Sequence, residues 1–196
     1  LHNAWMYQRV KNIDAVISLG ADVNCRNINV ETPLFFLCKV LSQNYFPRIS
    51  KDPKLYKNYI AKFIQILKRL LEAGIDINAR NQYGQTALFY VVNQNQNGIL
   101  RVLVDNGADV NVVALNGDNL MHKACENGNW WMLKKLLRLK CNHINSKNIA
   151  GFAPIHILCD SYSPKSDMSY LKCLSVLIKN GADIHCESNP GNTTPL

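Results

Sequence analysis

A five-residue phrase recurs along this chain. GADVN stands at residues 20–24 and again, unchanged, at 107–111. Looser copies begin at positions 74 (GIDIN), 141 (CNHIN) and 181 (GADIH). Two of the intervals between copies are about 33 residues, and the others are longer. One unit of this size cannot bury its apolar face alone, so the recurrence predicts similar units that stack side by side.

A second element follows each copy of the phrase at a nearly constant distance. It reads ETPLFFLC around Thr32, QTALFYVV around Thr86, DNLMHKAC around Asn119, FAPIHILC around Ala153 and TTPL at the end, and the opening LHNAW is a sixth copy. A period near 33 residues with T-P-L-H-x-A is typical of the ankyrin repeat. The chain resembles that family over essentially its whole length.

The resemblance implies an all-α solenoid, in which each unit is a β-hairpin turn followed by two antiparallel helices. Residues 1–196 are then expected to form a single array that is cut inside a repeat at both ends, as a piece of a longer protein. About five helix pairs are predicted, at 1–19, 34–73 with an insertion at 43–58, 88–106, 121–140 and 155–180.

The residues themselves support such a unit. In GILRVLVDNGADVN, the side chains of Ile99, Leu100 and Leu103 form an apolar helix face. Gly107 then permits the left-handed backbone that ends a helix. Thr32 and Thr86 stand directly before apolar runs, where we expect them to cap the next helix.

Composition excludes several classes of protein. The chain is 47% hydrophobic and 18% charged, as in folded globular domains, and the apolar segments carry Lys or Arg every few positions. No insertion into a membrane is therefore expected. The seven Cys form no CxxC pair, which favours a reducing, intracellular location, cytoplasmic or nuclear. The formal net charge of +8 is compatible with an acidic partner, a nucleic acid or an anionic membrane surface.

The His and Cys residues fall on repeat positions, so the sequence predicts no enzyme, no catalytic residue, no metal and no cofactor. The resemblance implies that His2, His122 and His156, at the fourth place of TPLH, bridge adjacent loops through hydrogen bonds. Alignment of the phrases predicts that Cys141 replaces the Gly. Free Cys packs as a small hydrophobic side chain, and we expect all seven to be reduced and free of metal.

The remaining variable positions are the candidates for a binding site. In repeat arrays the framework builds the stack, and the hairpin tips and first helices are left to contact a partner protein on the concave side. Apolar tip side chains either bind a partner or cover neighbouring hairpins. The candidates are Arg26, Ile28, Arg80, Gln82, Tyr83, Leu115, Asn116, Lys147, Ile149 and Phe152 at the tips, and Asn93, Gln94, Glu126 and Asn127 on the first helices.

An alternative places recognition elsewhere. The insertion sets Lys51, Lys54 and Lys57 beside Tyr56, which suits either an acidic partner or a solvated loop. Trp131 is either an exposed anchor or half-buried, and the basic run at 134–140 is read as the solvated face of a helix. In this alternative the chain is a targeting or substrate-recognition domain of a larger ubiquitin-ligase receptor, channel, enzyme or pathogen effector. Nucleic-acid binding is disfavoured, and the isolated chain is expected to be monomeric.

Overall fold

The computed structural model describes residues 15–39, 53–161, 167–188 and 194–195. The chain divides into two compact units, one of residues 1–82 with 86–108 and the other of residues 83–85 with 109–196. Within the described ranges the ordered elements are helices, and the β structure found there is one isolated bridge between Val113 and Asn119. His2 and Lys51 lie outside the described residues.

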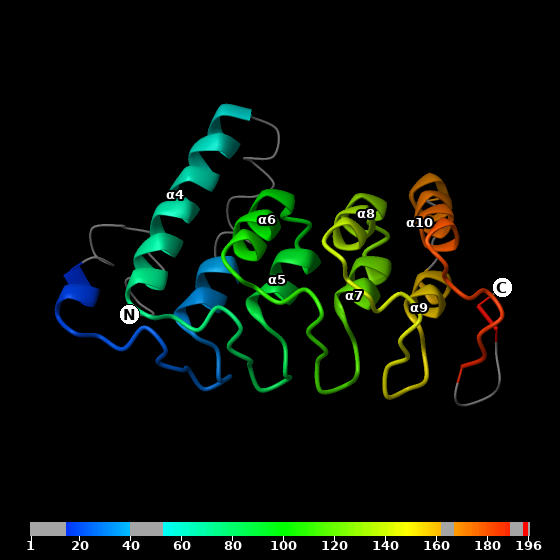
Figure 1. The fold of residues 1–196 in the computed structure, drawn as a ribbon, viewed down its shortest axis with the longest axis horizontal. Coiled ribbons are helices and arrows are strands. Elements are labelled where there is room, and N and C mark those ends of the chain that lie inside the picture. The colour runs from blue at the N-terminus through cyan, green and yellow to red at the C-terminus, as the bar shows by residue number, and fades with distance from the viewer. Residues whose placement is uncertain (1–14, 40–52, 162–166, 189–193, 196) are drawn as a thin grey trace. The chain divides into compact units, whose positions relative to one another are not determined.

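The first unit is built from helix pairs. Helical residues 15–18 and 33–39 precede α4 (Pro53–Glu72), α5 (Ala87–Asn93) and α6 (Asn97–Asp105), and α6 contacts both α4 and α5 (Figure 1). In α4 the buried side chains are Phe63, Ile66, Leu67 and Leu70. Their spacing of three and four residues places them on one face of the helix. Because α4 begins at Pro53, the last part of the segment predicted as an insertion belongs to this helix.

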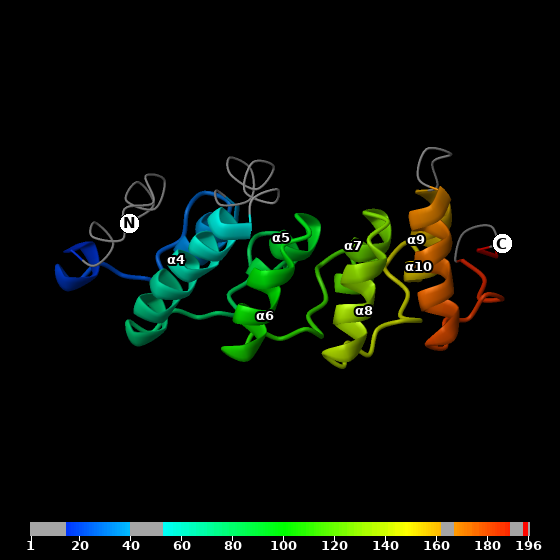
Figure 2. The same cartoon turned by 90° about the horizontal axis from the view of Figure 1, so that it is seen from above.

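The second unit repeats the arrangement in two layers. Its helices are α7 (Leu120–Glu126), α8 (Trp130–Arg138), α9 (Pro154–Asp160) and α10 (Asp167–Lys179). We call the first helix of each pair the inner helix and the second the outer helix. The inner helices α7 and α9 pack against each other, and so do the outer helices α8 and α10, as both ribbon views show (Figures 1 and 2). Leu120, Leu133 and Leu136 are fully buried between the layers. The apolar faces of successive pairs therefore bury one another.

The phrase forms the end of each outer helix. Gly107 has φ 93, its N–H donates to Val104 O at 3.0 Å, and the next N–H, of Ala108, donates to Leu103 O. In the fourth copy the same two bonds come from Lys140, with φ 61, and from Cys141. Cys141 was predicted to replace the Gly, and this is wrong. It takes the buried place of Ala, and Lys140 adopts the left-handed backbone.

The inner helices begin at the positions that the sequence predicts, but the N-cap side chain does not always make the expected capping hydrogen bond. Thr86 is the N-cap of α5, yet its hydroxyl makes no capping bond, and the buried hydroxyls of Thr32 and Thr86 both lack a partner within the described structure. The prediction that the Thr side chains cap these helices is therefore wrong. Asn119 does cap α7, because its side chain accepts from the N–H groups of Met121 and His122.

Candidate functional site

Backbone hydrogen bonds join neighbouring hairpin tips within each unit. In the first unit the N–H of Gln82 donates to Asn29 O at 3.2 Å. In the second unit Leu115 N–H donates to Tyr83 O at 2.9 Å, and Ile149 N–H donates to Asn116 O at 3.0 Å. The bonded pairs repeat at the same turn position, so within each unit one backbone hydrogen bond ties a tip to its neighbour. A side chain at a tip is thereby held at a fixed spacing from the next.

Large apolar side chains project from these tips. The exposed fractions are 94% for Ile28 in the first unit and 58%, 67% and 78% for Tyr83, Leu115 and Ile149 in the second. The prediction left open whether such side chains cover neighbouring hairpins. Leu115 does lie against the neighbouring hairpin, since a methyl carbon added at Gly84 would come within 2.9 Å of Leu115 Cγ, yet Leu115 is still 67% exposed. Exposed apolar side chains that recur at neighbouring tips suit a surface that a partner covers.

The polar candidates at the tips are partly engaged. Arg26 donates from its guanidinium to Arg80 O at 3.2 Å, and Lys147 Nζ donates to Glu187 O at 2.7 Å. Asn116 donates from Nδ2 to Asp118 at 2.7 Å. The side chains of Arg26, Arg80, Gln82, Asn116 and Lys147 nevertheless remain exposed. They form a polar border beside the apolar side chains.

Phe152 lies differently from the other tip candidates. It is half-buried at the base of its hairpin, where its ring is tilted against the His156 ring with centroids 5.9 Å apart. Its carbonyl oxygen lies 2.8 Å from His122 Nε2. Phe152 was predicted to be a tip residue because the repeat register gives the position of the hairpin. The register does not give the direction of the side chain.

The first-helix candidates gather at helix C-termini. Gln94 is the C-cap of α5 and follows Asn93, and Asn127 is the C-cap of α7 and follows Glu126. Glu126 accepts from Lys123 Nζ at 2.7 Å. These positions are half-buried or exposed, so each unit presents them at one edge of its inner helices.

The alternative candidates lie on other surfaces. Lys54 and Lys57 are exposed on the first turns of α4, which also contains Tyr56. Trp131 on α8 is 55% exposed and stacks on Trp130. Of the two possibilities left open for Trp131, the structure therefore gives an exposed side chain.

Histidines join adjacent loops in the second unit, as the resemblance implied. His122 Nε2 lies 2.8 Å from Phe152 O, and its Nδ1 accepts from Asn119 N–H at 3.3 Å. His156 makes the equivalent contacts, with Cys186 O at 3.0 Å and with Ala153 N–H at 3.2 Å. Both ring nitrogens of each histidine are thus engaged, which supports the structural role predicted for His122 and His156.

The burial of His122 predicts a pH dependence of stability. Desolvation lowers the pKa of His122, although the contacts with Phe152 and Asp118 oppose this effect. The folded chain then binds fewer protons at this site than the unfolded chain, so the unfolding free energy should fall as pH drops below the unfolded value of about 6.5. Urea unfolding at neutral and mildly acidic pH measures this, and the loss should be smaller in His122→Gln. An equal loss in the variant would contradict the assignment to His122.

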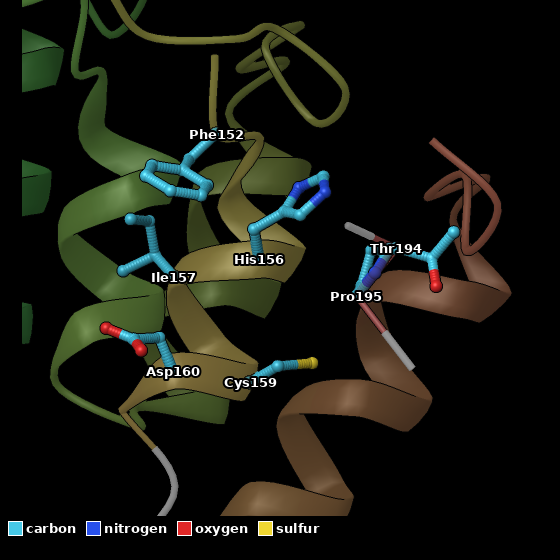
Figure 3. A pocket seen from close by; sticks show the side chains of 7 residues that line it. All are labelled: Phe152, His156, Ile157, Cys159, Asp160, Thr194 and Pro195. Atoms are coloured by element: carbon cyan, nitrogen blue, oxygen red, sulfur yellow. The ribbon is translucent and has the colours of Figure 1, made fainter. Parts of the chain in front are cut away.

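A pocket of about 240 Å³ beside α9 holds a Cys, a His and an Asp. Its lining residues are Phe152, His156, Ile157, Cys159, Asp160, Thr194 and Pro195 (Figure 3). The Cys159 thiol and the Asp160 carboxyl point in different directions from the helix (Figure 3). Cys159 Sγ accepts from Tyr170 O–H at 3.3 Å, while backbone groups engage His156. A nucleophile, a base and an orienting acid must contact one another in sequence, and this set does not.

Burial makes several of the cysteine thiols poor nucleophiles. None of the seven forms a disulfide, and burial raises the pKa of Cys141 and of Cys173 to about 11. A thiol with such a pKa holds little thiolate at neutral pH. No cluster of three or more candidate metal ligands occurs in the part of the chain that the structure describes.

A buried carboxylate in the first unit was missed by the sequence reasoning. Glu31 is 3% exposed and accepts from Tyr90 O–H at 2.6 Å and from Asn27 Nδ2 at 3.0 Å. Lys39 Nζ lies 4.0 Å from the same carboxylate. An acidic residue immediately before the buried TPL element was the available signal, because burial there requires polar partners.

Stacked helix pairs joined by hydrogen-bonded hairpin tips define a helical-repeat protein, a class whose members present surfaces for binding. The chain belongs to the ankyrin-repeat family, whose model, ankyrin repeats (3 copies), matches residues 58–148 and 96–189. The fold class predicted from the sequence, an all-α ankyrin solenoid, is confirmed. Ankyrin repeats generally mediate contacts between proteins, and such domains are typically not catalytic.

Individual relatives support the same family. The chain is 44% identical over 71 residues to the inactive serine/threonine-protein kinase TEX14 of Bos taurus, covering 36% of this chain and 5% of that protein. It is 29% identical over 153 residues to the nuclear factor NF-kappa-B p105 subunit of Gallus gallus, covering 74% of this chain and 15% of that protein. The chain thus spans a small part of the length of these relatives.

A solved structure shows the same fold. The crystal structure of an ankyrin repeat domain from Acinetobacter baumannii AYE superposes with a TM-score of 0.75 at 21% sequence identity, over 99% of this chain and 86% of that one.

None of the helices described here is both long and apolar enough to cross a membrane.

Proposed function

We propose that this chain is a non-catalytic module that binds another protein through the hairpin tips and the exposed edge of the inner helices. The observation that carries the proposal is the set of exposed apolar tip side chains, Tyr83, Leu115 and Ile149 in the second unit and Ile28 in the first. Their backbone is held by inter-tip hydrogen bonds. Little conformational entropy would be lost when a partner covers them, which favours affinity.

The surrounding residues fit the border of an interface. A binding site commonly has apolar anchors near its centre and solvated polar residues around them. Beside Leu115 and Ile149, the exposed Asn116 and Lys147 would supply such a border, and Glu126 and Asn127 at the C-terminal end of α7 would add polar contacts. In the first unit, Arg26, Arg80 and Gln82 at the tips would supply the polar border beside Ile28, and Asn93 and Gln94 at the end of α5 would add polar contacts.

Site-specific photo-crosslinking tests this proposal. A photoreactive amino acid at Leu115 or Ile149 should capture one discrete partner protein from cell extract, because these positions would lie inside the interface. The same group at Arg101, which is 80% exposed on α6, is the matched control. Equal capture of that protein from Arg101 and from the tips would contradict the proposed surface.

A second candidate function rests on the coverage of the relatives. The chain matches 5% and 15% of the lengths of TEX14 and the p105 subunit, which suits a targeting or substrate-recognition domain within a larger protein. In that reading Lys54 and Lys57, exposed on α4, contribute with Lys51 and Tyr56 to recognition of an acidic partner. Replacing the three Lys by Ser would then weaken binding, while Leu115→Ala would leave it unchanged. We further propose that either function operates inside the cell, in the cytoplasm or nucleus, because seven cysteines without a disulfide suit a reducing compartment.

A further inference from the structure

Two tryptophans and two lysines form a cluster on the outer helices of the second unit. The Trp130 and Trp131 rings stack with centroids 4.4 Å apart at an angle of 30°. Lys134 Nζ lies 4.9 Å from the Trp130 centroid and 5.9 Å from that of Trp131. Lys172 Nζ, from α10, lies 5.2 Å from the Trp130 centroid. We call these four residues the Trp–Lys face, and they lie on α8 and α10, away from the hairpin tips (Figure 1).

The Trp–Lys face carries positive charge with no acidic residue nearby in the sequence. Between Glu126 and Asp160 the chain has no Asp or Glu, but it has Lys134, Lys135, Arg138, Lys140 and Lys147. In α10 the residues after Asp167 include Lys172 and Lys179 and no acid. Among the described residues neither Lys134 nor Lys172 forms an ion pair. The positive charge here is therefore left to attract an anionic group from outside the chain.

The contacts with the indole rings hold the two lysine side chains in positions from which their ammonium groups can bind an anionic group. A lysine held over an aromatic face has lost part of its side-chain freedom, yet an ammonium has three N–H donors and can still donate to a carboxylate. Trp131, at 55% exposed, adds a large apolar surface next to these donors. Tryptophan is enriched among the residues that contribute most to binding energy in interfaces.

The same contacts argue against a nucleic acid. Stacking of a base requires an open aromatic face. Trp130 instead has Trp131 stacked on it and two ammonium groups over its ring, so the pair offers a base at most the outer face of Trp131. Successive bases of a single strand need several such faces. We propose that the Trp–Lys face is a second docking surface, which binds an acidic segment of a partner protein carrying an apolar side chain between its carboxylates.

A peptide titration against the full chain tests this surface. The probe is a synthetic peptide of repeated Glu-Glu-Leu triplets, and its control has Gln in place of Glu. The acidic peptide should quench tryptophan fluorescence and bind less tightly as salt is added, while the Gln peptide should not bind. Replacing Lys134 and Lys172 together by Gln should weaken binding roughly tenfold. Trp131→Ala should also weaken binding although it changes no charge.

The matched control removes the same charge elsewhere. Lys62 and Lys68 are exposed on α4, and their joint replacement by Gln should leave peptide affinity within about twofold of the original. Thermal melts of each variant confirm folding, since the replaced side chains lie at the surface. Equal weakening by the two double variants, failure of the acidic peptide to bind, or tighter binding of oligo-thymidine or of phosphatidylserine vesicles through Lys134 and Lys172 would overturn the proposal. Leu115→Ala should not change peptide binding, so this surface and the tip surface fail or succeed separately.

Discussion

Leu103→Ala is expected to lower the unfolding free energy by about 2–5 kcal/mol, because it removes a fully buried side chain and leaves a cavity. Leu103 lies near the end of α6, and its carbonyl oxygen accepts a hydrogen bond from Ala108 N–H at 3.0 Å. Its packing therefore supports both the helix and the start of the following loop. Urea unfolding measures the loss.

A neighbour provides the control for this prediction. Val104 is only partly buried on the same helix, so Val104→Ala should cost clearly less than Leu103→Ala. Equal losses for the two variants would contradict the burial that assigns Leu103 to the core. The far-ultraviolet circular dichroism of both folded variants should match that of the original chain.

Gly117→Ala is expected to cost about 2–5 kcal/mol, from backbone strain and from steric overlap together. Gly117 has φ 80, and an added methyl carbon would lie 2.7 Å from Ile149 N and 2.8 Å from Asn148 Cα. These are backbone atoms that cannot rotate away. The methyl group would therefore separate two tips and weaken the bond from Ile149 N–H to Asn116 O.

Gly128→Ala serves as the control that separates backbone strain from steric overlap. Gly128 has φ 59, and a methyl carbon there would meet nothing within 4 Å. Only the cost of the left-handed backbone remains, about 1–2 kcal/mol. Chemical unfolding of both variants should show a larger loss for Gly117→Ala. If Gly128→Ala is the more damaging change, close contact between the tips does not stabilise the second unit.

The repeated phrase predicts most of the fold because each of its residues has a local role. Gly107 marks the end of α6 correctly, since glycine adopts a left-handed backbone without strain. Lys140 adopts the same conformation at the end of α8, and no propensity scale would select it. There the surrounding helix and loop override the preference of the residue. This is why the place of Cys141 was predicted wrongly.

Side-chain direction explains what the sequence could not predict at the surface. Ile28, Leu115 and Ile149 were placed at tips by the register, and their exposure follows from the turn geometry. Phe152 has the same kind of sequence context but is half-buried near His156. The bond from Tyr90 to Glu31 joins residues of different repeats, and the cation–π contact of Lys172 with Trp130 joins α10 to α8. Such pairs depend on how successive repeats pack, which local sequence patterns do not specify.

Recognition by the hairpin tips can be decided by one calorimetric titration with the protein captured at Leu115. Leu115→Ala and Ile149→Ala should each weaken affinity by about 2 kcal/mol if they are anchors, while thermal melts change little because both side chains are exposed. Lys54→Ser and Lys57→Ser should bind as the original chain does. Unchanged affinity in the two tip variants, with a loss in the two Lys variants, would contradict recognition by the tips and move it to α4.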